Sequence, residues 1–132
     1  MEWTVSFQAE PRILIVQTAG IADAASTLAM VKDLVHGLQE HHVPRCLIDH
    51  RALSGVSGGT FELYDRPAQV REMGDARRVK IAEVIRPEHA PHFKFLETVF
   101  RNRGLNFMVF HDYAAALGWL LPRPPDEAGR PD

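Results

Sequence analysis

Short apolar runs of strand length alternate with stretches of helix length along this 132-residue chain, and this alternation constrains the fold more than any other feature. Residues 3–8 alternate apolar and polar side chains, which is typical of a strand with one solvated face. Residues 13–18 form an almost continuous β-branched run, which indicates a more central strand. Glu10 and Pro11 lie between the two runs and predict a turn, so we expect these strands to pair antiparallel.

Three more strand-like runs follow at residues 46–49, 80–85 and 106–110, each separated from the next by enough residues for a helix. Parallel strands need crossovers of this length. The sequence therefore predicts an α/β fold: a single-domain mixed sheet of about five strands, with the first strand antiparallel at an edge, covered by about four helices.

Apolar residues recur at helical spacing in residues 22–39, 91–103 and 112–120, which predicts three of these helices. The fourth, at residues 60–73, is interrupted by Pro67, so we expect a bent or two-piece segment there. We expect the domain to span residues 1–121. Residues 122–132 are rich in proline and predict a disordered tail.

The composition is that of an ordinary globular protein, with 45% hydrophobic and 24% charged residues. A net charge of −2 argues against nucleic-acid binding, which needs a basic face. Cys46 is the only cysteine, which favours a reduced, cytoplasmic location and a buried structural role for the thiol. We find no signal peptide and no apolar run long enough for a transmembrane segment.

Ligands of open α/β sheets gather beyond the carboxyl ends of the parallel strands. Asp49, His50 and Arg51 follow one predicted strand, and His111 follows another, so these are candidate binding residues. For Asp49 we favour a structural role, in which its carboxylate accepts backbone N–H bonds. The seven histidines supply no set of three ligands at metal-binding spacing, so we predict neither a metal nor a cofactor.

Residues 55–59, Gly-Val-Ser-Gly-Gly, match the loose Gly-x-Ser-x-Gly pattern of serine hydrolases. That pattern needs a strand directly before it, whereas about five loop residues separate Gly55 from the predicted strand end at Asp49. We therefore predict that the protein is not an enzyme. We expect no close Ser-His-Asp geometry among the candidate residues, which are Ser54, Ser57, His50, His111 and Asp112.

Three segments carry a family resemblance: CLIDHRAL with the Ser/Gly loop after it, KIAEVI, and the closing FMVFHDYAAALGWLL. From Ile13 to Leu121 the chain resembles the STAS-like (SpoIIAA-like) family. These small bacterial proteins are related to anti-sigma-factor antagonist domains, and they show fold similarity to CRAL-TRIO lipid-transfer domains. Ser57 is the closest match to the switch serine of the antagonists, but the Asp that precedes it there is missing here, so phosphorylation of Ser57 is left open.

The resemblance implies a non-catalytic interaction or regulatory module with a protein partner or a homodimer. Ser57 is then a candidate switch, and Phe61 and Tyr64 are candidate aromatic anchors in the helix that follows. The alternative is a carrier or sensor of an apolar, lipid-like small molecule that binds between helices and sheet.

Overall fold

The computed structural model describes residues 1–57 and 78–121, and within them the chain forms one five-stranded sheet of order β1-β2-β3-β4-β5. The strands are β1 (Glu2–Ala9), β2 (Arg12–Ala22), β3 (Arg45–Val56), β4 (Lys80–Val84) and β5 (Asn106–Phe110). Only β1 runs antiparallel to its neighbour, and the other three pairings are parallel. The predicted mixed sheet with an antiparallel first strand at one edge is confirmed.

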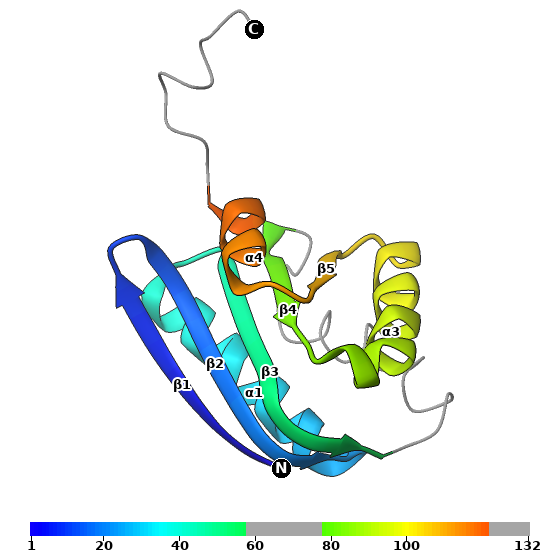
Figure 1. Cartoon of the computed structure of the whole chain (residues 1–132). Helices are drawn as coiled ribbons and strands as arrows, with labels where there is room; N and C mark the ends of the chain where they lie inside the picture. Colours follow the sequence, from blue (N-terminus) through cyan, green and yellow to red (C-terminus); the bar gives the residue numbers. More distant parts are fainter. Residues whose placement is uncertain (58–77, 122–132) are drawn as a thin grey trace, which may run out of the picture.

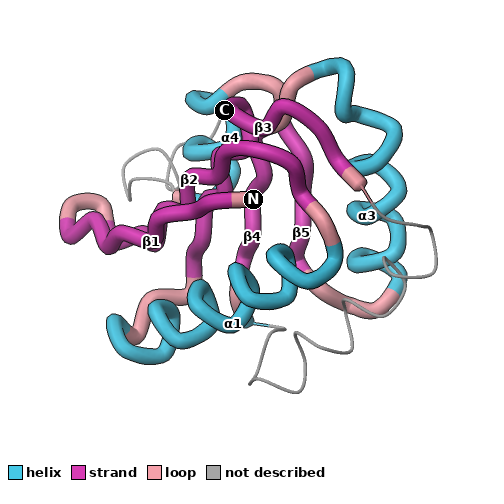
Figure 2. Tube along the Cα trace, turned by 90° about the horizontal axis from the view of Figure 1, so that it is seen from below, coloured by secondary structure: helices cyan, strands magenta, loops and turns pink. Residues whose placement is uncertain are grey.

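Helices cover both faces of this sheet (Figure 1). They are α1 (Ala24–His41), α3 (Ala90–Asn102), which follows the short 3-10 turn η2 (Pro87–His89), and α4 (Tyr113–Leu120). Seen from below, α1 and α4 lie on opposite sides of the strands (Figure 2). No helix in the described ranges is both long and apolar enough to cross a bilayer.

Two groups of buried apolar side chains correspond to the two faces. The larger group joins α1 and α3 to the sheet, and its members include Met30, Leu34, Ile48, Phe93 and Leu96. The smaller group lies under α4 and consists of Ile13, Leu47, Ala82, Val84, Ala116 and Leu120. Because strand side chains alternate in direction, neighbouring residues of β3 and β4 belong to different groups.

Local sequence signals place the helix ends. Asp23 caps α1 by accepting a hydrogen bond from the Ser26 backbone N–H at 2.8 Å. Asp112 caps α4 in the same way, accepting from the backbone N–H of Ala115 at 3.2 Å. Gly104 follows α3 with φ +82°, the left-handed conformation that favours glycine just beyond a helix end.

The structure corrects the predicted end of β3. The strand continues through Val56, so the expected loop after Asp49 is mostly strand, and Ser57 is its first residue beyond. The added length pairs with β2 across register shifts, because β2 also extends to Ala22 and offers a partner strand. The described residues contain three α-helices rather than four. The helix expected at residues 60–73, and the tail expected at 122–132, lie outside the described residues.

The neighbouring side chains of Trp119 and Leu120, near the end of α4, differ in burial. Trp119 is only partly buried, with its ring 5.9 Å from that of Phe110 and the Lys80 ammonium 4.9 Å above it. The well-buried residue of this helix is Leu120, which is 2% exposed.

Leu120→Ala should therefore destabilise the protein more than Trp119→Ala, although tryptophan is the larger side chain. We expect a loss of about 2–5 kcal/mol for Leu120→Ala, from lost burial and an unfilled cavity, and clearly less for Trp119→Ala. Urea unfolding of both variants measures the difference. An equal or reversed order would contradict the placement of α4.

Candidate functional site

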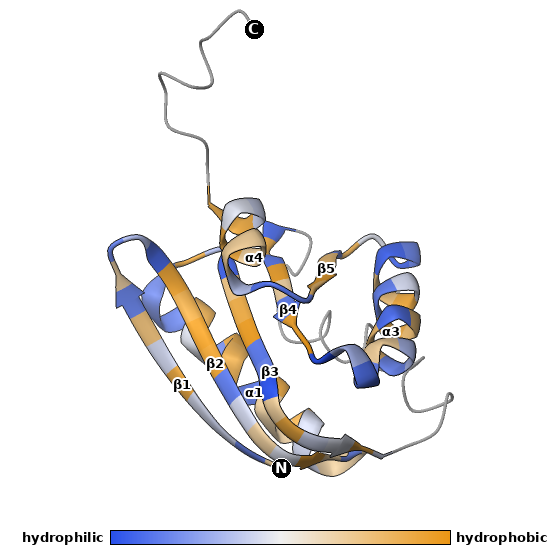
Figure 3. Ribbon diagram, viewed as in Figure 1, coloured by the Kyte–Doolittle hydropathy of each residue, from blue (hydrophilic) through white to orange (hydrophobic). Residues whose placement is uncertain are grey.

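The predicted Asp49-His50-Arg51 triplet divides between the two faces of the sheet. These residues lie inside β3 rather than after it, and a hydrophilic band crosses this otherwise apolar strand in Figure 3. His50 points towards α1 and α3, whereas Asp49 and Arg51 point towards α4, where Arg51 lies over the Tyr113 ring. The triplet therefore supplies two separate sites.

On the α1/α3 face, His50 is the centre of a buried chain of hydrogen-bonded side chains. Its Nδ1 lies 2.7 Å from the Thr18 hydroxyl, and its Nε2 lies 2.9 Å from Oε2 of Glu83. The three side chains come from β2, β3 and β4, and each residue is at most 4% exposed. The Phe93 ring stacks on the imidazole with a centroid distance of 4.8 Å. Three neighbouring strands and α3 are thus joined at one imidazole.

The hydrogen bonds among Thr18, His50 and Glu83 leave no free base. The Thr18 hydroxyl also lies 3.3 Å from the carbonyl oxygen of Asp49, to which it can donate. When the hydroxyl donates to that carbonyl, Nδ1–H of His50 donates to the hydroxyl, and Nε2 is hydrogen-bonded to Oε2 of Glu83. Both ring nitrogens are occupied, so His50 has no nitrogen left to activate a nucleophile or a substrate.

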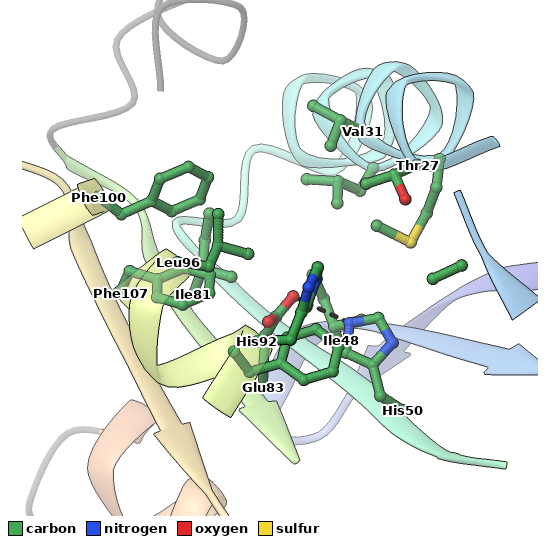
Figure 4. A pocket seen from close by; sticks show the side chains of 14 residues that line it. Thr27, Val31, Ile48, His50, Ile81, Glu83, His92, Leu96, Phe100 and Phe107 are labelled. Atoms are coloured by element: carbon green, nitrogen blue, oxygen red, sulfur yellow. Dashed lines mark hydrogen bonds and ion pairs between the residues drawn. The ribbon is translucent and has the colours of Figure 1, made fainter. Parts of the chain in front are cut away.

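A cavity lies beside His50 and Glu83, between α1, α3 and the sheet (Figure 4). The cavity encloses about 30 Å³. The unfilled space rises to about 520 Å³ when the surrounding crevices and the mouth, with the open solvent in it, are included. The walls are mostly apolar, formed by residues such as Met30, Leu96 and Phe100, while His50 and Glu83 form a polar floor. An apolar pocket with a few polar groups is the usual form of a small-molecule site.

On the other face, Asp49 holds the Arg51 side chain in place. Its carboxylate accepts bonds from Arg51 Nε at 2.9 Å and Nη2 at 2.8 Å, and one from the backbone N–H of Arg51 at 3.1 Å. The Arg51 guanidinium lies 5.2 Å from the centroid of the Tyr113 ring, and its side chain remains 51% exposed. The structural role expected for Asp49, accepting a backbone N–H, is present, and its second role is to orient a cation.

This arrangement sets the charge states of the pair. Burial on its own would raise the pKa of Asp49, but the hydrogen bonds and positive charge of Arg51 outweigh it, and the net pKa lies below the ordinary 3.8. The same contacts with Asp49 raise the pKa of Arg51. Both side chains are therefore ionised at neutral pH.

The other predicted site residues do not join either cluster closely. Ser57 is exposed, and its backbone N–H donates to the carbonyl of Ala22 at 2.7 Å. His111 is exposed beside the α4 cap. Within residues 1–57 and 78–121, no hydrogen bond links the hydroxyl of Ser54 or Ser57 to a histidine. Phe61 and Tyr64 lie outside the described residues.

Neither thiol nor metal chemistry gains support from the described part of the chain. Cys46 is 0% exposed, and burial, followed by the nearby Glu83 carboxylate, raises the pKa of its thiol. A buried, protonated thiol is unreactive. Among the residues that the structure describes, no group of three or more histidine, cysteine or acidic side chains could hold a metal ion.

Sequence reasoning missed Thr18 and Glu83. The signal for Glu83 was present, since Lys80-Ile81-Ala82-Glu83-Val84-Ile85 places a carboxylate among apolar residues that read as a buried strand. A buried carboxylate needs a partner, and His50 lies close to the predicted end of the preceding strand. Thr18 carries no comparable signal, because threonine is common in strands.

Comparison with known proteins identifies the fold. No family model and no curated protein sequence matches the chain. Among solved structures, an anti-sigma factor antagonist from Mycobacterium paratuberculosis superposes with a TM-score of 0.57 at 16% identity, covering 90% of this chain and 94% of that one. An uncharacterized protein with a SpoIIAA-like fold from Shewanella loihica PV-4 gives a TM-score of 0.54 at 18% identity, covering 90% and 93%. The chain has the SpoIIAA-like, or STAS-like, fold.

The buried pair makes a prediction about stability. His50→Leu leaves the Glu83 carboxylate buried without its partner and should cost about 3–5 kcal/mol. The double variant His50→Leu with Glu83→Leu should regain most of this loss, because two apolar side chains replace the pair. A double-mutant cycle from urea unfolding measures the coupling, and additive effects of the two substitutions would refute it.

A second prediction concerns acid stability. Because the folded-state pKa of Asp49 is lowered, its ionised form contributes stability that is fully present above the ordinary value of 3.8 and is lost as the pH falls through the lowered folded value. The stability of the native protein should therefore exceed that of Asp49→Asn by a constant amount at neutral pH, and the difference should shrink in acid. Urea unfolding at about pH 7, 5 and 3 tests this. A difference independent of pH would contradict it.

Proposed function

We propose that this protein is a non-catalytic interaction module that binds a regulatory protein through the surface around Arg51. The observation that carries the proposal is the Asp49–Arg51–Tyr113 arrangement, in which a partly exposed guanidinium is fixed by a carboxylate and lies over an aromatic ring. Arginine and tyrosine are enriched among the residues that dominate binding energy at protein interfaces. A side chain that is already fixed loses little entropy when a partner binds.

The position of Arg51 also supports docking. It lies on the α4 face in the second half of β3, towards the carboxyl edge of the parallel strands. The exposed side chains of His111 and Asp112, which follow β5, lie at that same edge. Asp112 contributes to the electrostatic environment of Arg51, so the two charges are near one another. A partner that binds here contacts the Tyr113 ring together with the positive charge of Arg51 and the negative charge of Asp112.

The buried chain on the other face does not favour catalysis. A hydroxyl, an imidazole and a carboxylate in sequence have the composition of a nucleophile with its base. Here Thr18 is 3% exposed and its hydroxyl donates to a backbone carbonyl, so the hydroxyl is not presented to a substrate. The arrangement is better explained as a structural hydrogen-bond chain.

The fold neighbours are consistent with this proposal. One of the two solved structures compared above is described as an anti-sigma factor antagonist. At 16% identity the likeness shows the fold alone. The identity of the partner therefore rests on experiment, and a second copy of this chain is among the partners to be tested.

Arg51→Ala should weaken partner binding while the fold is retained. The matched control is Arg103→Ala, because Arg103 is also exposed but precedes β5 and so lies towards the opposite edge of the sheet. Tagged native protein and both variants are used for quantitative affinity enrichment from source cells, and enriched proteins are purified and titrated directly.

We expect at least one partner whose affinity falls by about tenfold or more with Arg51→Ala and stays unchanged with Arg103→Ala, since such a loss corresponds to about 1.4 kcal/mol. Sedimentation of the pure protein shows whether that partner is a second copy. Equal effects of the two substitutions on every partner would refute the docking surface.

The cavity favours a second candidate function, in which the protein carries or senses a small molecule with an apolar part. The cavity lies between helices and sheet, where the alternative reading of the sequence expected such a ligand. The enclosed volume of about 30 Å³ holds only one or two water-sized groups, so a long acyl chain does not fit without displacement of the walls. The cavity therefore supports a small ligand over a bulky lipid.

A further inference from the structure

Two buried polar atoms in the cavity have no hydrogen-bond partner within the described part of the chain. They are Oε1 of Glu83, on the sheet side, and the hydroxyl oxygen of Thr27, on the α1 side. Glu83 is 4% exposed and Thr27 is 8% exposed, so bulk water reaches neither readily. An unpaired buried acceptor is costly, and most native structures avoid it.

Oε1 of Glu83 specifies the chemistry of a matching ligand. The other carboxylate oxygen, Oε2, is taken by His50 at 2.9 Å, so Glu83 offers one remaining acceptor position to the cavity. An ionised carboxylate accepts hydrogen bonds and donates none. A ligand group that donates would satisfy it, whereas an ether oxygen would not, and the carboxylate of a fatty acid would be repelled.

Size and shape limit the ligand further. The enclosed volume of about 30 Å³ accommodates a polar end group with one or two non-hydrogen atoms. Of the lining residues, Val31 of α1 and His92 of α3 are the ones that are not fully buried, so the cavity opens near these two side chains. An aliphatic tail of a few carbons can lie along the apolar walls towards this opening.

We propose that the cavity binds a small aliphatic alcohol, with the hydroxyl group donating to Oε1 of Glu83 and the carbon chain against the apolar side chains of α1 and α3. A neutral hydroxyl is preferred to an ammonium group, because the apolar walls cannot satisfy three N–H donors. This inference rests on the second candidate function. It is independent of the Arg51 docking surface, which lies on the opposite face of the sheet.

The test compares two isomers on the native protein. 1-Butanol and methyl propyl ether have the same formula, but only the alcohol can donate a hydrogen bond, and butyrate adds an anionic comparison. Each is titrated while NMR follows the Met30 methyl group and the His50 ring, which both line the cavity. We expect 1-butanol to bind about tenfold or more tightly than the ether, the effect of one hydrogen bond to a charged group, and butyrate not to bind.

Two variants test whether the hydroxyl of the alcohol donates its hydrogen bond to Oε1 of Glu83. Glu83→Gln should weaken 1-butanol binding by about fivefold or more, because a neutral amide is a weaker acceptor than a carboxylate. Thr27→Val, the matched control, removes the other unpartnered oxygen from the α1 side of the same cavity and should leave the preference for the alcohol over the ether intact.

Three outcomes would overturn the proposal: equal affinity for the two isomers, an unchanged affinity in Glu83→Gln, or spectral changes spread over surface residues rather than the cavity. If Glu83→Gln fails to fold, the isomer comparison on the native protein decides alone. None of these outcomes bears on the loss of partner binding in Arg51→Ala, so the two proposals fail separately.

Discussion

The hydrogen bond between His50 and Glu83 is the interaction on which the centre of the sheet depends. It joins β3 to β4 at 2.9 Å among apolar side chains, and Thr18 extends it to β2. A lone carboxylate or imidazolium at this depth would be strongly destabilising, so each side chain is tolerated only because the other is present. The Phe93 ring stacks on the imidazole, and the packing of α3 against the sheet therefore depends on the same pair.

Side chains alternate in direction along β3, and this places two kinds of polar group on opposite faces of the sheet. One residue carries the imidazole into the α1/α3 face, while its neighbours Asp49 and Arg51 point to the α4 face. Arg51 reaches the Tyr113 ring at the start of α4 and remains partly exposed. The buried cavity and the proposed docking surface thus involve consecutive residues, and substitutions in one should leave the other largely unaffected.

The sequence predicted the order and pairing of the elements well, because the alternation of side chains in strands and the apolar stripes of helices are local signals. It failed where tertiary contacts decide. The strand β3 continues past Asp49 because β2 continues beside it, which no local pattern reveals. Likewise, His50 was read as part of a loop cluster, whereas its partners Thr18 and Glu83 are 32 and 33 residues away in the chain.

Stability alone does not account for the buried pair. Two apolar side chains of similar volume often replace a buried ion pair with little or no loss of stability. Here Oε1 of Glu83 also has no hydrogen-bond partner among residues 1–57 and 78–121, which costs about 1–3 kcal/mol more. A donor that enters the adjoining cavity would remove this cost, and the gain would appear as binding energy. The Glu83 carboxylate therefore makes better physical sense as the floor of a binding site than as a part of the core.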